Sequence, residues 1–267
     1  MFMSTQLEKD VLYPDSDGKP MAESDIHCDR IINILVMLKD RYRKDPNVYV
    51  AGNLFLYFEE GNPRRNVAPD VMVVLGVEKK YRRSYKVWAE GKAPDMIIEV
   101  TSDSTQYEDL YAKKELYREL GVKEYYLFDP TGDYLSEPLQ AYHLVEGEYQ
   151  PVPSEGGFWR SPVLGLTLKA EGGHLRLYDA QTGEPLLDPA AQSQAREQAE
   201  VERRRAEAAR QQAETALGQA ETARQQAETA REQAEAACRR EAEARQAAEV
   251  ELQRLRTELA RLKKPLP

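Results

Sequence analysis

The first clear pattern in the chain is a set of apolar residues at helical spacing. One helix face would carry Ile31, Ile32, Leu35 and Leu38. Ser24 can cap the start of this segment, and Pro46 lies beyond its end. The pattern predicts a helix over about residues 24–44.

Short runs rich in β-branched and aromatic residues follow, separated by glycine, proline and polar turns. They predict strands at 48–52, 54–58, 70–77, 95–100, 124–129, 139–145, 148–152, 165–170 and 175–180. A second helix is expected at 105–120, because Thr105 and Glu108 have capping-box spacing and Gly121 suits a helix end. Strands accompanied by two helices predict an α/β fold with a mixed central sheet.

The composition changes abruptly after Pro185 and Pro189, and a heptad repeat begins. Alanines alternate spacings of three and four residues, as a and d positions do, at Ala213, Ala216, Ala220, Ala223, Ala227, Ala230, Ala234 and Ala237. Four leucines continue this spacing after a register shift, at Leu252, Leu255, Leu259 and Leu262. Two domains are therefore predicted, residues 1–188 and an alanine-rich helix over 189–267.

The predicted tail helix has two interpretations. An alanine seam buries little apolar area, so the segment can be a solvated single helix with Glu–Arg pairs along it. Alternatively, the terminal leucines lock a narrow coiled coil, and the protein is a homo-oligomer, most simply a dimer.

Charge separates the same two parts of the chain. From Ala190 onward lie 15 basic and 14 acidic residues, which leaves 22 of the 37 basic and 32 of the 46 acidic residues before it. An acidic body argues against non-specific nucleic-acid binding but not against an enzyme that binds cations through carboxylates. We expect a cytoplasmic protein without a membrane partner, since no signal-like segment opens the chain and no apolar run approaches ~18 residues.

Two acidic residues stand in or beside apolar strands, where unpaired charges are costly. Asp70 opens one predicted strand, and Glu99 lies inside another. Acids on neighbouring strands can share a hard divalent cation such as Mg²⁺. Asp95 lies about 13 Å from Glu99 along an extended strand, so it is interpreted as a strand-entry residue. The three histidines, His27 among them, are scattered and carry little weight.

A lysine on the second predicted helix would add a cation to these acids. Lys113 falls on the apolar stripe between Leu110 and Tyr117, but Lys114 flanks the same stripe. Periodicity alone does not choose between them. A lysine that faces the sheet needs an anion, whereas a snorkelling lysine needs none.

Three stretches carry the acids and the lysine: VAPDVMVVLGV (67–77), APDMIIEVTSDST (93–105) and DLYAKKELYRELGVKEYYLFDP (109–130). Together they resemble the Uma-type restriction endonuclease family of the PD-(D/E)XK nuclease superfamily. The resemblance implies a restriction-endonuclease-like mixed sheet flanked by helices. It also implies that Asp70 and Glu99 are the catalytic and metal-binding carboxylates. Thr101 occupies the usual lysine position, so the resemblance assigns that role to Lys113, and it suggests Glu23 as an auxiliary acid.

The activity that the resemblance implies is hydrolysis of DNA phosphodiester bonds with Mg²⁺ or Mn²⁺. Asp70 and Glu99 would hold the metal, and Lys113 would orient the attacking water or stabilise the developing charge. The basic segment 79–88 is either a DNA contact or a solvated loop. The competing hypothesis is a non-catalytic scaffold that assembles through its coiled coil, because fold alone does not decide function.

Overall fold

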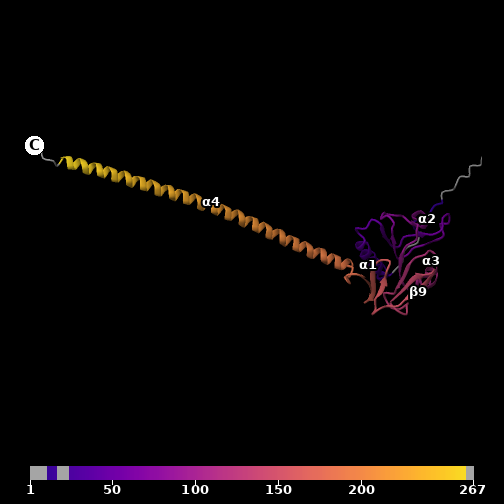
Figure 1. The fold of residues 1–267 in the computed structure, drawn as a ribbon. Coiled ribbons are helices and arrows are strands. Elements are labelled where there is room, and N and C mark those ends of the chain that lie inside the picture. Colours follow the sequence, from indigo (N-terminus) through magenta and orange to yellow (C-terminus); the bar gives the residue numbers. More distant parts are fainter. Residues whose placement is uncertain (1–10, 17–23, 263–267) are drawn as a thin grey trace, which may run out of the picture. The chain divides into compact units, whose positions relative to one another are not determined.

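The computed structural model describes residues 11–16 and 24–262 (Figure 1). It divides into two units, residues 1–194 and 195–267. The first unit contains every described strand. Its helices are α1 (Asp25–Arg41), α2 (Val87–Glu90), the π-helix η1 (Glu108–Lys113), α3 (Lys114–Glu119) and the first turns of α4 (Pro189–Leu262).

Twelve strands are described in the first unit. They are β1 (Val48–Ala51), β2 (Leu56–Tyr57), β3 (Asn66–Val67), β4 (Val71–Leu75), β5 (Tyr85–Lys86), β6 (Met96–Val100), β7 (Glu124–Phe128), β8 (Leu139–Val145), β9 (Glu148–Val152), β10 (Trp159–Ser161), β11 (Leu166–Glu171) and β12 (His174–Asp179).

Six of these strands form the central sheet, in the order β1-β4-β6-β7-β8-β9. The β6–β7 pair is parallel and the other neighbours are antiparallel, so the predicted mixed sheet is confirmed. The sequence between β6 and β7 supplies η1 and α3, the crossover that a parallel pair requires. Two smaller sheets have the orders β10-β11-β12 and β3-β2-β5.

Each face of the central sheet is buried against different elements (Figure 1). On one face α1 and the β10–β12 sheet pack over Val71, Ile98 and Phe128. On the other face Tyr117 from α3 packs with Ile97 and residues of the β3-β2-β5 sheet. Because both faces are covered, β4, β6 and β7 are almost continuous apolar runs. The predicted α/β class, with helices flanking the sheet, is thus confirmed.

Helix α1 agrees with its prediction except in the face that it buries. Ser24 is the N-cap, and its hydroxyl accepts a hydrogen bond from the His27 amide at 3.3 Å. The buried face runs through His27, Ile31, Ile34 and Leu38. Ile32, which was placed on that face, is exposed. The apolar stripe is wider than the contact, so the pattern alone did not fix the rotation of the helix.

The second predicted helix forms, but not as a regular α-helix. Its middle is the π-helix η1, and α3 continues from it. The expected capping box is absent, because the Thr105 hydroxyl instead accepts a hydrogen bond from the Ser102 amide at 3.2 Å. Strands β3, β5 and β10 were not predicted; β3 and β5 are two residues long and β10 is three residues long.

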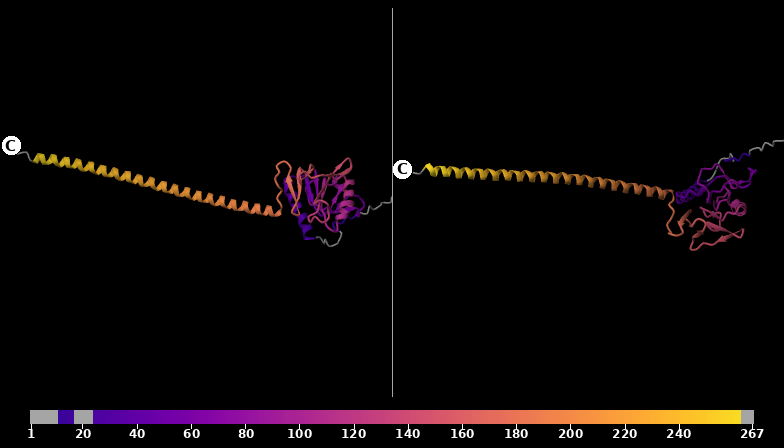
Figure 2. Two further views of the ribbon diagram at one scale, coloured as in Figure 1. Left: turned by 90° about the horizontal axis from the view of Figure 1, so that it is seen from below. Right: turned by 45° about the horizontal axis from the view of Figure 1, so that its top comes forward.

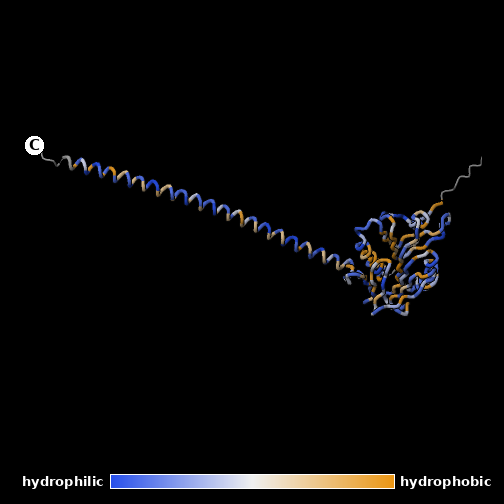
Figure 3. Tube along the Cα trace, viewed as in Figure 1, coloured by the Kyte–Doolittle hydropathy of each residue, from blue (hydrophilic) through white to orange (hydrophobic). Residues whose placement is uncertain are grey.

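Helix α4 spans 74 residues and continues into the second unit. It is unbroken in each view of Figure 2, so the predicted long helix is confirmed. Hydrophilic residues dominate its length (Figure 3), and Glu–Arg pairs four residues apart line it, for example Arg210–Glu214 and Arg231–Glu235. Leu252, Leu255 and Leu259 are exposed on it. Its pairing into a coiled coil remains a prediction.

Within the described parts of the chain, no helix combines the length and the apolar character needed to cross a bilayer.

Candidate active site

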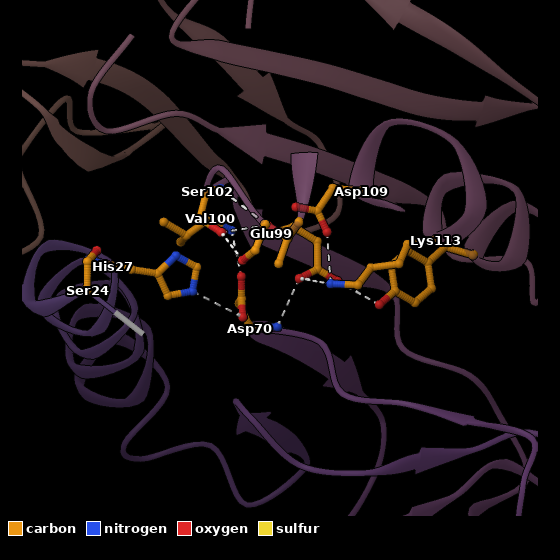
Figure 4. Close-up of polar contacts among 11 residues, drawn as sticks. Ser24, His27, Asp70, Glu99, Val100, Ser102, Asp109 and Lys113 are labelled. Atoms are coloured by element: carbon orange, nitrogen blue, oxygen red, sulfur yellow. Dashed lines mark hydrogen bonds and ion pairs between the residues drawn. The ribbon is translucent and has the colours of Figure 1, made fainter. Parts of the chain in front are cut away.

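Strands β4 and β6 bring the two predicted carboxylates together (Figure 4). The strands pair antiparallel with Val71 opposite Ile98, so Asp70 and Glu99 come next to each other at one end of the pairing. Asp70 is 8% exposed and Glu99 is fully buried. Two acidic side chains thus lie side by side in an otherwise apolar part of the sheet.

Hydrogen bonds fix both carboxylates. The Val100 amide donates to Asp70 Oδ2 at 2.8 Å, and the Asp70 amide donates to Glu99 Oε2 at 3.2 Å. The Tyr117 hydroxyl donates to Glu99 Oε1 at 2.6 Å. Each acid is therefore held by the backbone of the neighbouring strand, which orients the pair without a bound ligand.

The structure separates the two candidate lysines. Lys113 Nζ lies 3.1 Å from Glu99 Oε2, and its side chain is only 12% exposed. Lys114 points elsewhere, with its Nζ 3.4 Å from the centre of the Tyr142 ring. Lys113 is thus the lysine beside the acidic pair. Thr101, two residues after Glu99, is buried, but it brings no charge.

A third acid, Asp109, was missed by the sequence reasoning. It is fully buried on η1, and its Oδ1 lies 2.8 Å from Lys113 Nζ. The only signal in the sequence was its four-residue spacing from Lys113, which is common on solvated helix faces. The π-helical turn places Asp109 and Lys113 together on the side that faces Glu99 (Figure 4), and such turns are frequent at functional sites.

The electrostatics of this cluster follow from burial and from an excess of acids. Burial is the largest cause that raises the pKa of the Glu99 carboxyl; Asp70 and Asp109 add to the rise, Lys113 and Tyr117 oppose it, and the net pKa is about 8. Burial also raises the pKa of Asp109. Burial opposes the charge on Lys113, but Glu99 and Asp109 outweigh it and raise the lysine pKa. One ammonium cannot neutralise three ionised carboxylates, so near neutral pH Glu99 holds a proton unless a further cation binds and takes its place.

His27 also lies at this site, although its sequence position gave it little weight. It is buried on α1, and its Nε2 is 3.7 Å from Asp70 Oδ1. The N-cap of α1 lies one turn earlier and sets where this side chain enters the core. Glu23, the suggested auxiliary acid, falls outside the described residues.

The donor set fits a magnesium or manganese ion with few protein ligands. Among the described residues, no group of three or more His, Cys, Asp or Glu side chains is arranged to hold a metal. Mg²⁺ does not need such a cage, since it is often bound by one or two carboxylates together with waters and substrate phosphates. Asp70 and Glu99 offer hard oxygen donors of that kind, and their charge exceeds what Lys113 balances.

Asp95 has a different environment, which agrees with its interpretation as a strand-entry residue. It accepts hydrogen bonds from the Leu75 amide at 2.8 Å, from Lys92 at 2.7 Å and from Lys123 at 2.8 Å. Burial works against its charge, but the bonds from Lys123 and Lys92 hold the Asp95 pKa below its usual value. Asp95 therefore fastens β4 to the start of β6 and has no role in the acidic cluster.

Comparisons with known proteins match the same part of the chain. Residues 5–171 match a family model described as "Uma2: Putative restriction endonuclease". No curated protein matches the sequence. One similar solved structure comes from Anabaena variabilis ATCC 29413 and is described as "a putative nuclease belonging to DUF820". It is 16% identical, with 55% of this chain and 76% of that chain covered and a TM-score of 0.41.

Proposed function

The chain belongs to the Uma2 restriction endonuclease family, and on that premise we propose that it is a metal-dependent endonuclease that hydrolyses phosphodiester bonds in DNA. The observation that carries the proposal is the cluster of Asp70, Glu99 and Lys113. Two carboxylates on adjacent strands meet a nearly buried lysine, whose Nζ is 3.1 Å from Glu99. A buried charge cluster of this kind is costly to fold, and perturbed acids of this kind gather at active sites.

Asp70 and Glu99 would hold Mg²⁺ or Mn²⁺. When bound, the ion polarises the phosphate and lowers the pKa of the attacking water. The Val100 and Asp70 amides and the Tyr117 hydroxyl keep the two carboxylates in place. The protein thereby fixes the donor oxygens before the substrate arrives, which avoids reorganisation during the reaction.

Lys113 would orient the attacking water or stabilise the negative charge that develops on the phosphate. Its ammonium is fixed between Glu99 and Asp109, and its raised pKa keeps it charged. Asp109 acts through Lys113 as a positioning residue. The buried Asp109 carboxylate holds the ammonium at the edge of the acidic pair and prevents it from collapsing onto Glu99 alone.

The experiment that tests the proposal is a nicking assay with purified full-length protein on supercoiled plasmid DNA. Conversion to open circles should require Mg²⁺ or Mn²⁺ and should stop when EDTA is added. An Asp70→Asn protein purified in parallel should not nick the plasmid, and this control excludes a contaminating nuclease.

A second candidate function, a scaffold without catalysis, is favoured by one observation. Helix α4 carries a line of exposed leucines, and the body that precedes it is acidic. In this reading the nuclease fold is retained as a platform, and self-association of the tail is the function. A wild-type protein that binds no divalent metal and nicks no DNA would favour the scaffold over the enzyme.

Tail association has its own test. The change Leu252→Ala/Leu255→Ala/Leu259→Ala removes three seam leucines and should weaken self-association by at least about a hundredfold, because buried leucines carry most of the apolar contact. Sedimentation velocity should show a shift from dimer to monomer. Leu217→Ala removes an exposed leucine outside the alanine seam and should leave the dimer intact. A wild-type protein that is monomeric at tens of micromolar would contradict the coiled coil and leave the single helix.

A further inference from the structure

A groove follows the open edge of the central sheet, where β1 has a neighbour on one side only. Its volume is about 500 Å³. Three segments form it: the end of α1, the chain from β1 to Leu54, and the loop 79–82. We propose that this groove binds one strand of a nucleic acid and leads it to the Asp70–Glu99 pair. The inference rests on the proposed nuclease function and names the part of the protein that holds the substrate.

Charge is the first argument. Of the described residues that line the groove, none is acidic and five are basic: Lys39, Arg43, Lys79, Lys80 and Arg82. The remainder of the body has an excess of acids, so this cluster is a local exception to the charge of the whole chain. A concave surface of one sign concentrates ligands of the opposite sign, and a phosphate backbone is such a ligand.

The five basic residues fall into two groups: two are bonded within the protein and shape the groove, and three are available to contact a ligand. The Arg82 guanidinium is nearly buried and forms two bonds to Glu90, at 2.7 and 2.8 Å. Lys79 donates to the carbonyls of Tyr42 and Arg43 at the end of α1. These two residues therefore fix the walls of the groove.

The other three, Lys39, Arg43 and Lys80, are exposed. Arg43 forms an ion pair with Asp40 at 3.7 Å, and Lys80 forms one with Glu78 at 3.3 Å. Exposed ion pairs of this kind are weak, so their cations remain available to phosphates.

Aromatic side chains are the second argument. Tyr81 is fully exposed, with a relative exposure of 107%, in the middle of the basic loop. Tyr49 lies in the floor, with the Arg82 guanidinium 4.2 Å from its ring centre. Channels for single-stranded nucleic acids combine a basic track with aromatic rings on which bases stack. A single strand can turn a base onto Tyr81, whereas the bases of a duplex remain stacked on each other.

The position of the groove is the third argument. Gly52 lies in its lining, and a Cβ added there would be 2.2 Å from the Asp70 carbonyl oxygen. The Asn53 amide also donates to the Pro69 carbonyl at 2.9 Å. One end of the groove therefore touches the backbone that carries Asp70. A strand that lies along β1 would pass from Lys39 and Lys80 towards the candidate active site.

The test measures binding without cleavage. Full-length protein in EDTA is titrated into a fluorescein-labelled (dT)20 oligonucleotide, and anisotropy is followed at several salt concentrations. The variant Arg43→Glu/Lys80→Glu should bind at least about tenfold more weakly, with a smaller salt slope, because each phosphate contact in a single strand contributes about 0.7 to that slope. Tyr81→Ala should bind about tenfold more weakly with the salt slope unchanged.

The matched control is Arg64→Glu/Arg160→Glu, which makes the same change in net charge at exposed residues outside the groove lining. It should bind like wild type. The Asp70→Asn protein should also bind (dT)20, although it should not cleave DNA. A loss of nuclease activity can therefore be distinguished from a loss of oligonucleotide binding in the groove. The inference is overturned if the groove variants bind like wild type, if a duplex of equal length binds more tightly than (dT)20, or if wild type binds only an extended acidic peptide.

Discussion

Asp70→Asn and Glu99→Gln should each lower plasmid nicking by about a thousandfold or more, because each removes one of the two carboxylates proposed to hold the metal. Both changes keep the size of the side chain. An asparagine oxygen can still accept the hydrogen bond from the Val100 amide, and a glutamine oxygen can still accept from Tyr117. The lost activity would therefore follow from lost charge rather than from a collapsed site. Calorimetry with Mn²⁺ should show weakened or absent binding for both variants.

Asp95→Asn is the matched control for these variants, because it neutralises another buried acid of the same sheet. Its partners Lys92 and Lys123 are partly exposed and can turn to water. We expect a loss of about 1–3 kcal/mol in the free energy of unfolding, with nicking and Mn²⁺ binding retained. The Asp95 pKa is lowered in the folded state, so its contribution is present at neutral pH and is lost as pH falls through that pKa. An Asp95→Asn protein as inactive as Asp70→Asn would contradict the assignment of the site.

Local patterns were sufficient to predict the central sheet. Strands β4, β6 and β7 are continuous apolar segments, so their type is visible in any short window of sequence. Strands β3 and β5, which were not predicted, are two residues long, and each pairs with β2 from another part of the chain. No local pattern encodes such a pairing. The rotation of α1 was misjudged for a similar reason, since the buried side depends on which strands lie beneath it.

The acids of the candidate site also differ in whether a local sequence pattern reveals them. Asp70 and Glu99 could be found because a charge in or beside an apolar strand is costly and needs a partner. Asp109 could not, because Tyr107 and Glu108 beside it are exposed and its own burial arises from β7. The Tyr125 hydroxyl of that strand donates to the Asp109 carbonyl at 2.8 Å. The π-helical turn that carries Asp109 was not predicted either, since the pattern over 105–120 indicated a regular helix.

Lys113→Met should lower nicking by about a hundredfold to a thousandfold while Mn²⁺ still binds, since it removes a charge that acts in the chemical step and leaves both proposed metal ligands in place. Methionine retains most of the length and packing of the lysine stem. The substitution removes the ammonium that pairs with Glu99 and Asp109. The negative charge of these acids is then less compensated, so the affinity of the site for the metal should not fall. A role in metal binding would instead reduce affinity and activity together.

Lys114→Met separates this prediction from a general effect of removing a cation from the helix. The two lysines are neighbours in sequence, but Lys114 lies over the Tyr142 ring and has no carboxylate of the cluster beside it. Its replacement should change nicking by less than about threefold, because a cation–π contact of this type contributes about 0.5–2 kcal/mol to stability and nothing to the reaction. A Lys113→Met protein that nicks DNA like wild type would refute the proposed mechanism. Inactivity confined to Lys114→Met would mean that the helix presents a different face to the substrate than the one that meets Glu99 here.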